Sequence, residues 1–337
     1  MLNNKTILIT GGTGSLGKEL VSFILKKYKK IKKIIIFSRD ELKQHEMSLK
    51  ISTGDLKKIR FFLGDIRDLQ RLNYAFKNVD YIIHAAALKQ VNTAEYNPFE
   101  FIKTNILGAQ NIIEAALNSK VKKVMALSTD KAAAPINLYG ATKLCSDKLF
   151  TAANNYTGSE NKVFSVIRYG NVFGSRGSVV PTLLKFDQNK NFLPITDLNM
   201  TRFSLSISDA VSFVMKCLDM SIGGEIFVPK IKSYKLIDLA NSINSKKKKK
   251  AIGLRPGEKI HEELITKADS STTFDMGNYY VILPPQYEEN LYRNKYKKFK
   301  ENRKVKSDFS YNSFNNNDFL TIKQLKNQTK IYKKNNE

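Results

Sequence analysis

The chain has 337 residues, a formal net charge of +25 and 42% hydrophobic residues. This length allows one large α/β domain with a smaller lobe. No apolar run approaches the roughly 18 residues of a membrane span, so we expect a cytoplasmic protein with no membrane partner. The positive charge is spread along the chain without interleaved aromatics, which favours solvated lysines over a nucleic-acid surface.

Short apolar runs rich in β-branched residues alternate with amphipathic stretches through the first half of the chain. The predicted strands are 6–10, 33–38, 59–63, 81–86, 121–128 and 163–169. Continuous apolar runs are typical of parallel strands that are buried on both faces. Between them, apolar residues recur at helical spacing, as at Leu16, Leu20 and Ile24. The pattern predicts an α/β fold with a Rossmann-like, doubly wound parallel sheet.

This alternation breaks after about residue 175. We expect residues 1–175 to form a dinucleotide-binding domain. Residues 176–286 would form mainly a smaller mixed α/β substrate-binding lobe, with some segments returning to the first domain, and 287–337 a loosely packed, basic Asn/Lys-rich tail. The elements predicted here are strands 192–195, 201–207 and 225–228, helices 209–218, 235–243 and 321–328, and a loop at the lysine run 246–250.

Cysteine and histidine patterns indicate no metal site. Cys145 and Cys217 form no CxxC pair, so we expect two buried, reduced thiols. His45, His84 and His261 form no metal-ligand motif, and His84, at the end of the fourth predicted strand, is interpreted as a buried histidine with a satisfied hydrogen bond.

A glycine-rich turn follows the first predicted strand. Gly11, Gly14 and Gly17 stand three apart, the spacing that allows a tight turn, a close approach to a pyrophosphate and helix–strand packing. The following helix offers free N–H groups to phosphates. The turn therefore predicts a dinucleotide site, whose contacts here are Gly11, Thr13, Gly14, Ser15, Leu16 and Gly17.

Later strand ends carry the other candidate cofactor residues. Ser38, Arg39 and Asp40 end the second strand, with Lys43 one turn further on. An arginine suits the 2′-phosphate of NADP, whereas Asp40 leaves NAD open, so NADP is the expected cofactor and NAD the alternative. The remaining candidates for cofactor binding are Asp65, Ile66, Ala85, Ala86, Lys89, Asn105, Ser128, Tyr139, Lys143, Tyr169, Asn171 and Val172.

Tyr139 and Lys143 are spaced to lie on one face of a helix. The pKa of a free tyrosine is about 10, and a nearby ammonium lowers it by stabilising the phenolate. Ser128 and Thr129 end a predicted strand about ten residues upstream, where a hydroxyl can hold the same substrate oxygen. The pattern predicts that Tyr139 exchanges a proton with a substrate hydroxyl.

These motifs together resemble the extended short-chain dehydrogenase/reductase superfamily. Longer blocks are similar to the inverting UDP-N-acetylglucosamine 4,6-dehydratases, of the type that begins pseudaminic acid synthesis. Within about residues 4–285 the blocks are SRDELKQ at 38–44, AEYNP at 94–98, STDKA at 128–132, RYGNV at 168–172, GSRGSV at 174–179, MTRF at 200–203 and RPGEK at 255–259. The chain departs from the family at 90–92 and 133–135, which bears on fine substrate specificity.

The resemblance implies a reaction and its residues. C4 of the sugar is oxidised, water is eliminated across C5–C6, and C6 is reduced with inversion at C5, giving a UDP-2-acetamido-2,6-dideoxy-4-hexulose while tightly bound NADP is regenerated. Asp130 is the implied acid at C6 and Lys131 the implied base at C5, with the reverse assignment open. An acidic carboxyl then needs a raised pKa and the lysine a lowered one. Tyr139, Lys143 and Thr129 complete the implied catalytic set.

Substrate contacts and assembly are also implied by the resemblance. The implied substrate-binding residues are Lys89, Thr129, Asn171, Arg176, Ser178, Val179, Thr201, Arg202, Arg255 and Glu258. An arginine fork matches the oxygens of a diphosphate. A homo-oligomer such as a hexamer is implied, and flagellin, capsule and lipopolysaccharide are all open as destinations of the sugar.

Three other functions remain open on the sequence. A nucleotide-sugar 4-epimerase or 4-reductase of the same superfamily would need Tyr139 and Lys143 but not Asp130 and Lys131. A non-catalytic NADP-binding scaffold or sensor commonly loses the tyrosine or the lysine, and this chain has both. A basic nucleic-acid binder would show salt-dependent binding to DNA.

Overall fold

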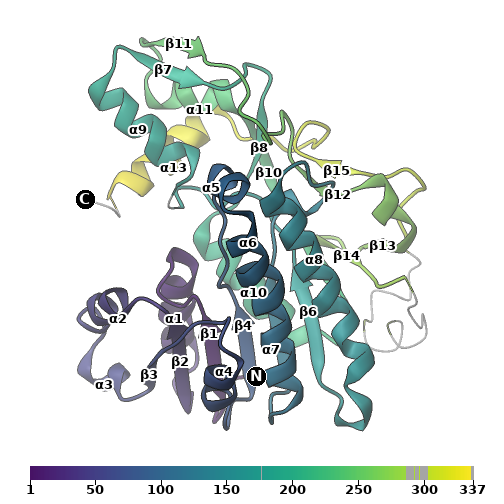
Figure 1. Cartoon of the computed structure of the whole chain (residues 1–337). Helices are drawn as coiled ribbons and strands as arrows, with labels where there is room; N and C mark the ends of the chain where they lie inside the picture. The colour runs from purple at the N-terminus through teal and green to yellow at the C-terminus, as the bar shows by residue number, and fades with distance from the viewer. Residues whose placement is uncertain (176, 286–291, 293–295, 297–302, 335–337) are drawn as a thin grey trace.

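The computed structural model describes residues 1–175, 177–285, 292, 296 and 303–334. A nine-stranded sheet runs through the larger part of the molecule in the order β13-β14-β9-β6-β5-β4-β1-β2-β3 (Figure 1). The strands are β1 (Thr6–Thr10), β2 (Lys33–Ser38), β3 (Ile59–Leu63), β4 (Tyr81–His84), β5 (Lys123–Leu127), β6 (Val163–Ile167), β9 (Ile226–Pro229), β13 (Thr273–Asp275) and β14 (Tyr279–Ile282). All pair in parallel except β13 and β14, which form an antiparallel edge.

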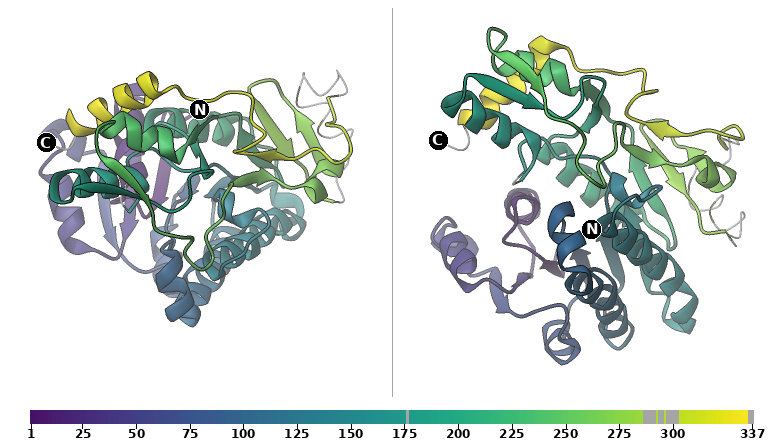
Figure 2. Two further views of the ribbon diagram at one scale, coloured as in Figure 1. Left: turned by 90° about the horizontal axis from the view of Figure 1, so that it is seen from above. Right: turned by 45° about the horizontal axis from the view of Figure 1, so that its top comes forward.

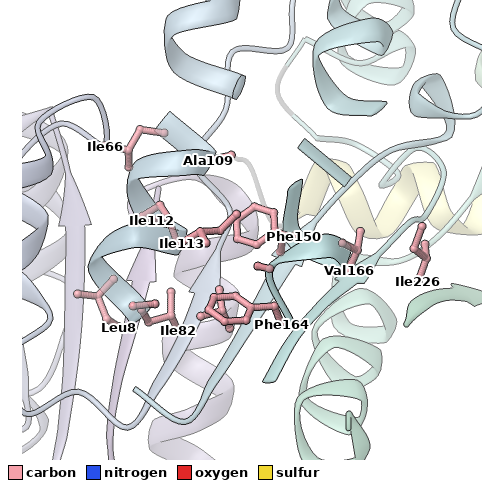
Figure 3. Close-up of a cluster of buried hydrophobic side chains, with 14 of the residues drawn as sticks. Leu8, Ile66, Ile82, Ala109, Ile112, Ile113, Phe150, Phe164, Val166 and Ile226 are labelled. Atoms are coloured by element: carbon pink, nitrogen blue, oxygen red, sulfur yellow. The ribbon is translucent and has the colours of Figure 1, made fainter. Parts of the chain in front are cut away.

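Helices cover both faces of this sheet, which confirms the predicted doubly wound fold. They are α1 (Ser15–Lys27), α2 (Glu41–Ser48), α3 (Thr53–Leu56), α4 (Leu69–Ala75), α5 (Val91–Tyr96), α6 (Pro98–Phe101), α7 (Gly108–Leu117), α8 (Leu138–Ala152) and α10 (Ile207–Met220). A π-helical stretch, Ile102–Leu107, joins α6 to α7. Figure 3 shows one core layer, in which Ile112 and Ile113 of α7 and Phe150 of α8 pack on Leu8 and Phe164 of the sheet. A second cluster lies between the other face and helices α1 and α10.

A smaller lobe lies above the sheet in Figure 1, and Figure 2 shows it from two further directions. Its elements are α9 (Val179–Asn189), β7 (Phe192–Ile195), β8 (Thr201–Ser204), β10 (Lys232–Lys235), α11 (Leu236–Ile243), β11 (Lys248–Ala251) and α13 (Ile322–Lys334). Strands β7 and β11 pair in parallel and β8 and β10 antiparallel. Beside the lobe, β12 (Glu263–Ile265) pairs with β15 (Tyr311–Asn312).

The structure corrects two predictions about Lys-rich segments. The loop predicted at 246–250 is wrong over its second half, because Lys248–Ala251 pairs with β7, and Lys250 Nζ lies 5.5 Å from the centre of the Phe192 ring. The loose packing predicted for the tail is wrong at Tyr311, Ser313, Leu320, Leu325 and Thr329, which are buried. Helix α13 extends beyond the predicted 321–328, and Leu320 and Leu325 are buried in the core of the smaller lobe.

Smaller differences concern element ends and one thiol. Strand β4 ends at His84, β5 begins at Lys123 and β6 ends at Ile167, because the chain leaves the sheet there to enter loops. Cys217 is buried as expected, but Cys145 is exposed because it lies on the solvent side of α8. Among the described residues, no helix has the length and apolar character that a bilayer crossing needs.

Candidate active site

Most predicted site residues line one cleft of about 1180 Å³. Its floor is formed by the segments that follow β1 to β6, and its other wall by residues between 178 and 262, most of them in the smaller lobe. The carboxyl ends of parallel strands share one edge of a sheet, and the strand order reverses between β1 and β4. Ligands of open α/β sheets bind at this position.

The glycine turn is packed closely against neighbouring backbone. Gly11 has φ +66°, and a Cβ there would lie 2.9 Å from the Ala86 nitrogen. A Cβ on Gly17 would lie 2.4 Å from the Gly12 oxygen. Helix α1 begins after Gly14 with no side-chain hydrogen bond capping its first turn. Because these residues line the cleft, their N–H groups can bind phosphate oxygens.

Thr10 and His84 hold the two strand ends around this turn. The Thr10 hydroxyl accepts hydrogen bonds from the N–H groups of Ala85 and Ala86 at 3.1 and 3.2 Å. It therefore donates its own proton to His84 Nδ1, 2.8 Å away, so the ring carries its proton on Nε2. Burial lowers the pKa of His84 to about 3. His84 is thus a neutral histidine that fixes the strand end, as predicted.

Arg39 and Asp40, the candidate contacts for NADP and NAD after β2, have different surroundings. The Asp40 carboxylate caps α2 by accepting from the Lys43 N–H at 2.9 Å, and it also pairs with the Lys43 ammonium. The Arg39 side chain is 51% exposed and lies 3.5 Å from Asp65. Burial alone would raise the pKa of Asp65, but hydrogen bonds from Arg67 hold it below its usual value. A cation therefore projects at this end of the cleft while the Asp40 carboxylate is engaged.

Tyr139 and Lys143 lie on α8 and are 9% and 3% exposed. The helix begins there because the Asn137 side chain accepts from the Gly140 N–H at 2.8 Å, and its amide donates to the Gly257 oxygen. Burial raises the pKa of Tyr139 to about 12, although the Lys131 ammonium and a hydrogen bond with Thr129 oppose this. The expected net lowering of this pKa by Lys143 is therefore wrong, because burial dominates and the opposing cation is Lys131.

Burial also lowers the pKa of Lys143 itself, and the buried carboxylate of Asp147, one helical turn further along α8, opposes that shift. Asp147 accepts a hydrogen bond from the Ser128 hydroxyl at 2.9 Å and pairs with Arg168. Asp147 was not predicted, although its spacing of four from Lys143 was an available signal.

Asp130 and Lys131 form a single 3₁₀ turn, Asp130–Ala132, directly after β5. Lys131 lines the cleft, whereas Asp130 lies behind it with no exposed surface. Asp130 Oδ1 accepts from the Thr129 hydroxyl at 2.8 Å and from Lys131 Nζ at 3.2 Å. Burial and the charge of Glu262 raise the pKa of Asp130, as an acid requires. Burial favours a lowered pKa for Lys131, but Asp130 and Glu262 raise it overall, so the expected lowering is wrong.

A glycine joins this turn to the tyrosine helix. Gly140 follows Tyr139, and a Cβ there would lie 2.2 Å from the backbone oxygen of Lys131. Gly140→Ala is therefore expected to push α8 and the Asp130–Lys131 turn apart, lowering the free energy of unfolding by about 1–3 kcal/mol and reducing activity. Chemical denaturation and turnover assays would measure both. Gly54→Ala, where no atom lies within 4 Å, is the matched control; equal stability of the two variants would contradict the close packing.

Residues of the smaller lobe form a chain of ion pairs along the opposite wall. Arg255 contacts Glu258 through two hydrogen bonds of 2.9 and 3.0 Å. Arg202 is buried, donates to the Thr201 and Ile260 oxygens, and lies 3.4 Å from Glu258 and 3.6 Å from Glu262. Arg202, Arg255 and Glu258 all line the cleft, so this wall offers guanidinium groups to an anionic ligand.

Three predicted site residues do not line the cleft, and one lies outside the described residues. Asn105 is buried, with hydrogen bonds to Leu88 and Thr142. Thr201 is buried and contacts His261 and Ser313. Asp130 is the third, and Arg176 is not described. The residues that do line it are Gly11, Thr13, Gly14, Ser15, Leu16, Gly17, Ser38, Arg39, Asp40, Lys43, Asp65, Ile66, Ala85, Ala86, Lys89, Ser128, Thr129, Lys131, Tyr139, Lys143, Tyr169, Asn171, Val172, Ser178, Val179, Arg202, Arg255 and Glu258.

Two further residues at the site were not predicted. Glu262 is 2% exposed and accepts a hydrogen bond from Lys131 Nζ at 3.1 Å. Lys259 Nζ donates to the Ala133 oxygen at 2.6 Å. Both lie in or just after the RPGEK block, which was the available signal. Among the described residues, no three His, Cys, Asp or Glu side chains are grouped so that they could hold a metal ion.

This sheet order and glycine turn define a protein of the Rossmann-like, doubly wound class. The sequence model of a family described as "Polysaccharide biosynthesis protein" matches residues 7–284, and the chain belongs to this family. A Campylobacter jejuni protein named UDP-N-acetylglucosamine 4,6-dehydratase (inverting) is 52% identical over 330 residues, covering 96% of this chain and 97% of the relative. A Rickettsia bellii protein named UDP-glucose 4-epimerase is 46% identical over 289 residues, 84% of each chain.

Solved structures show the same architecture. Pen from Bacillus thuringiensis has a TM-score of 0.86 and 36% identity, covering 97% of this chain and 98% of its own. The Streptomyces venezuelae dTDP-glucose 4,6-dehydratase DesIV, in a double mutant with NAD bound, has a TM-score of 0.66 and 21% identity, covering 75% of this chain and 86% of its own. At that identity the second likeness shows the fold alone.

Proposed function

We propose that this protein is a UDP-N-acetylglucosamine 4,6-dehydratase that inverts C5. The observation that carries the proposal is the meeting of Tyr139, Thr129 and Lys131 at one point of the cleft, with the Asp130 carboxyl directly behind Lys131. The name of the Campylobacter jejuni relative, which matches nearly the whole chain, supports the same reaction.

The cleft fits a nicotinamide dinucleotide. A Cβ on Gly11 or Gly17 would collide with backbone atoms of Ala86 or Gly12, so the close turn before α1 depends on these glycines, and the uncapped first turn of α1 supplies donors for a pyrophosphate. When bound, the nicotinamide supplies the chemistry of accepting and returning hydride. Arg39 would pair with a 2′-phosphate, and the engagement of Asp40 with Lys43 removes the acid that a free 2′-hydroxyl would need, so NADP is the proposed form.

The chain's own residues would move the protons. Tyr139 takes the proton of the 4-hydroxyl as C4 is oxidised, with Thr129 holding the same oxygen. The resulting ketone acidifies the C5 proton, which Lys131 removes as a neutral amine, the minor form of this group because Asp130 and Glu262 raise its pKa. Asp130 supplies the proton that leaves with the 6-hydroxyl as water, and since Asp130 does not line the cleft, this proton passes through the Thr129 hydroxyl or Lys131. Reprotonation of C5 from the opposite face gives inversion.

A 4-epimerase is the second candidate, because the Rickettsia bellii relative carries that name. Epimerisation at C4 requires the tyrosine–lysine pair alone. It gives no role to an acid–base pair beside the tyrosine, whereas elimination of water needs one. The burial of Asp130 against Lys131 therefore favours the dehydratase.

The proposal also covers the setting of the reaction. We propose that residues 1–175 bind the cofactor and that 176–286 mainly bind the sugar nucleotide, in a cytoplasmic homo-oligomer. The product would enter glycan synthesis, and pseudaminic acid is the destination that the sequence blocks imply. Mass measurement in solution would test the assembly.

One assay tests the reaction. Purified protein, loaded with NADP⁺ or NAD⁺ in separate samples, is incubated with UDP-N-acetylglucosamine without added reductant, and the sugar is followed by NMR. The expected product is a 6-deoxy-4-keto sugar with C5 inverted, formed fastest with NADP⁺. An unchanged C6 hydroxymethyl group, or a C4 epimer, would refute the dehydratase.

A further inference from the structure

The mechanism above gives no role to Glu262, a buried carboxylate at the site. Glu262 lies directly before β12, and its Oε1 is 3.1 Å from Lys131 Nζ and 3.6 Å from Arg202 Nε. Its other oxygen, Oε2, is buried and has no hydrogen-bond partner among the described residues. Burying a carboxylate oxygen without a hydrogen-bond partner raises the free energy of the folded state. Such groups are commonly found at functional sites.

Glu262 and Asp130 hold the same ammonium group. Lys131 Nζ lies 3.2 Å from Asp130 Oδ1 and 3.1 Å from Glu262 Oε1. Asp130 Oδ2, like Glu262 Oε2, is buried without a hydrogen-bond partner in the described part of the chain. Two buried carboxylates around one lysine cannot both be ionised at low cost, so one of them favours the neutral form.

The surroundings decide which carboxyl carries the proton. Glu262 faces three cations, Lys131, Arg202 and Lys259, and their charges outweigh burial and lower its pKa. At Asp130 the charge of Lys131 and the Thr129 hydroxyl do not outweigh burial and the Glu262 charge, which raise its pKa. The arrangement is therefore an ion pair between Glu262 and Lys131, with a neutral Asp130 beside it.

The C-terminal segment fixes the main chain at Glu262. The Glu262 N–H donates to Ser313 Oγ at 2.9 Å. The Ser313 N–H donates to the backbone carbonyl oxygen of Glu262 at 2.8 Å. Ser313 is fully buried and its hydroxyl also contacts Thr201 Oγ1 at 2.7 Å. Glu262 is thus held by residues that follow the family match, which ends at 284.

We propose that Glu262 is a positioning residue that serves as the counter-ion of Lys131 and thereby keeps the acid's proton on Asp130. The inference deepens the proposed function and rests on it. Loss of the Glu262 charge would leave Asp130 as the counter-ion of Lys131, and Asp130 would then release its proton more readily.

The test is the pH dependence of kcat in Glu262→Gln. The Glu262 charge raises the pKa of both Asp130 and Lys131. Its removal should therefore move both limbs of the profile to lower pH, by about 1 pH unit or more, and kcat at neutral pH should fall about 10-fold or more. A purely structural role would lower kcat without moving the limbs.

Other charged groups around the cluster stay in place in this variant, so the movement of the limbs reports Glu262. They are Arg202, Lys259, Lys89, Glu258, Tyr139 and Tyr234. The matched control is Glu263→Gln, because Glu263 is adjacent but does not line the cleft. Its profile should match that of the unmodified protein.

Glu262→Asp provides a second test if Glu262→Gln does not fold. Circular dichroism and thermal unfolding would check the folding of each variant. The shorter side chain withdraws the carboxylate from Lys131, so the limbs should move in the same direction by less. Limbs that stay at their original pH in a folded variant would overturn the inference. Absence of the 6-deoxy-4-keto product from the unmodified protein would instead overturn the proposed function.

Discussion

Tyr139→Phe is expected to leave a folded protein whose dehydratase rate is about 10²–10⁴-fold lower. The variant loses only the phenolic hydroxyl, and the remaining ring still fills the buried position on α8. The 4-hydroxyl then has no group to take its proton, so oxidation at C4 fails before elimination can begin. NMR of the sugar should show unchanged UDP-N-acetylglucosamine, and thermal unfolding should match that of the unmodified protein.

The control for this variant is Tyr280→Phe. Tyr280 lies on β14, away from the cleft, and burial raises its pKa to about 12, as for Tyr139. Removing a buried phenolic hydroxyl there should leave turnover within about twofold, in line with substitutions outside the reacting groups. Full turnover in Tyr139→Phe would exclude Tyr139 as the proton acceptor.

Asp130→Asn is the second large effect. Asparagine has nearly the same shape but cannot donate a proton to the departing 6-hydroxyl, so water loss should fall by about 10²–10⁴-fold. Oxidation at C4 and removal of the C5 proton use Tyr139 and Lys131 and should persist. In D₂O, recovered substrate should therefore gain deuterium at C5 while little 6-deoxy sugar forms.

The control for Asp130→Asn is the same substitution at a carboxylate outside the cleft. Asp275→Asn removes one that pairs with Lys230 at 2.7 Å on the surface, and water loss should be unchanged. Rapid formation of the 6-deoxy product by Asp130→Asn would assign the acid to another group. Absence of C5 exchange, with the fold intact, would instead place Asp130 in the earlier oxidation or proton-removal steps.

The sheet and the cofactor turn were predictable from sequence because local rules decide them. Strands buried on both faces must be apolar along their whole length, and β1, β2 and β3 have the predicted bounds. The glycine spacing is imposed by atoms one turn away, such as the Gly12 oxygen beside Gly17. The Tyr139–Lys143 pair follows from helical spacing on α8.

Features that depend on contacts between distant segments could not be predicted. The lysines of β11 form a strand only because β7, over fifty residues earlier, offers a partner edge. The pKa values of Tyr139 and Lys131 depend on burial and on Glu262, which is 131 positions from Lys131. A helix was predicted at 321–328, but its extension to Lys334 and the burial of Leu325 in the core of the smaller lobe were not.

The smaller lobe is assembled from chain segments that are far apart: 179–204, 232–251 and 320–334. The sheet core from β1 to β6 is complete by residue 167. During synthesis on a ribosome, domains fold as their residues emerge, and contacts of high sequence separation form late. We expect nascent chains to gain affinity for the dinucleotide well before they gain it for the sugar nucleotide, because α13 is translated long after β6.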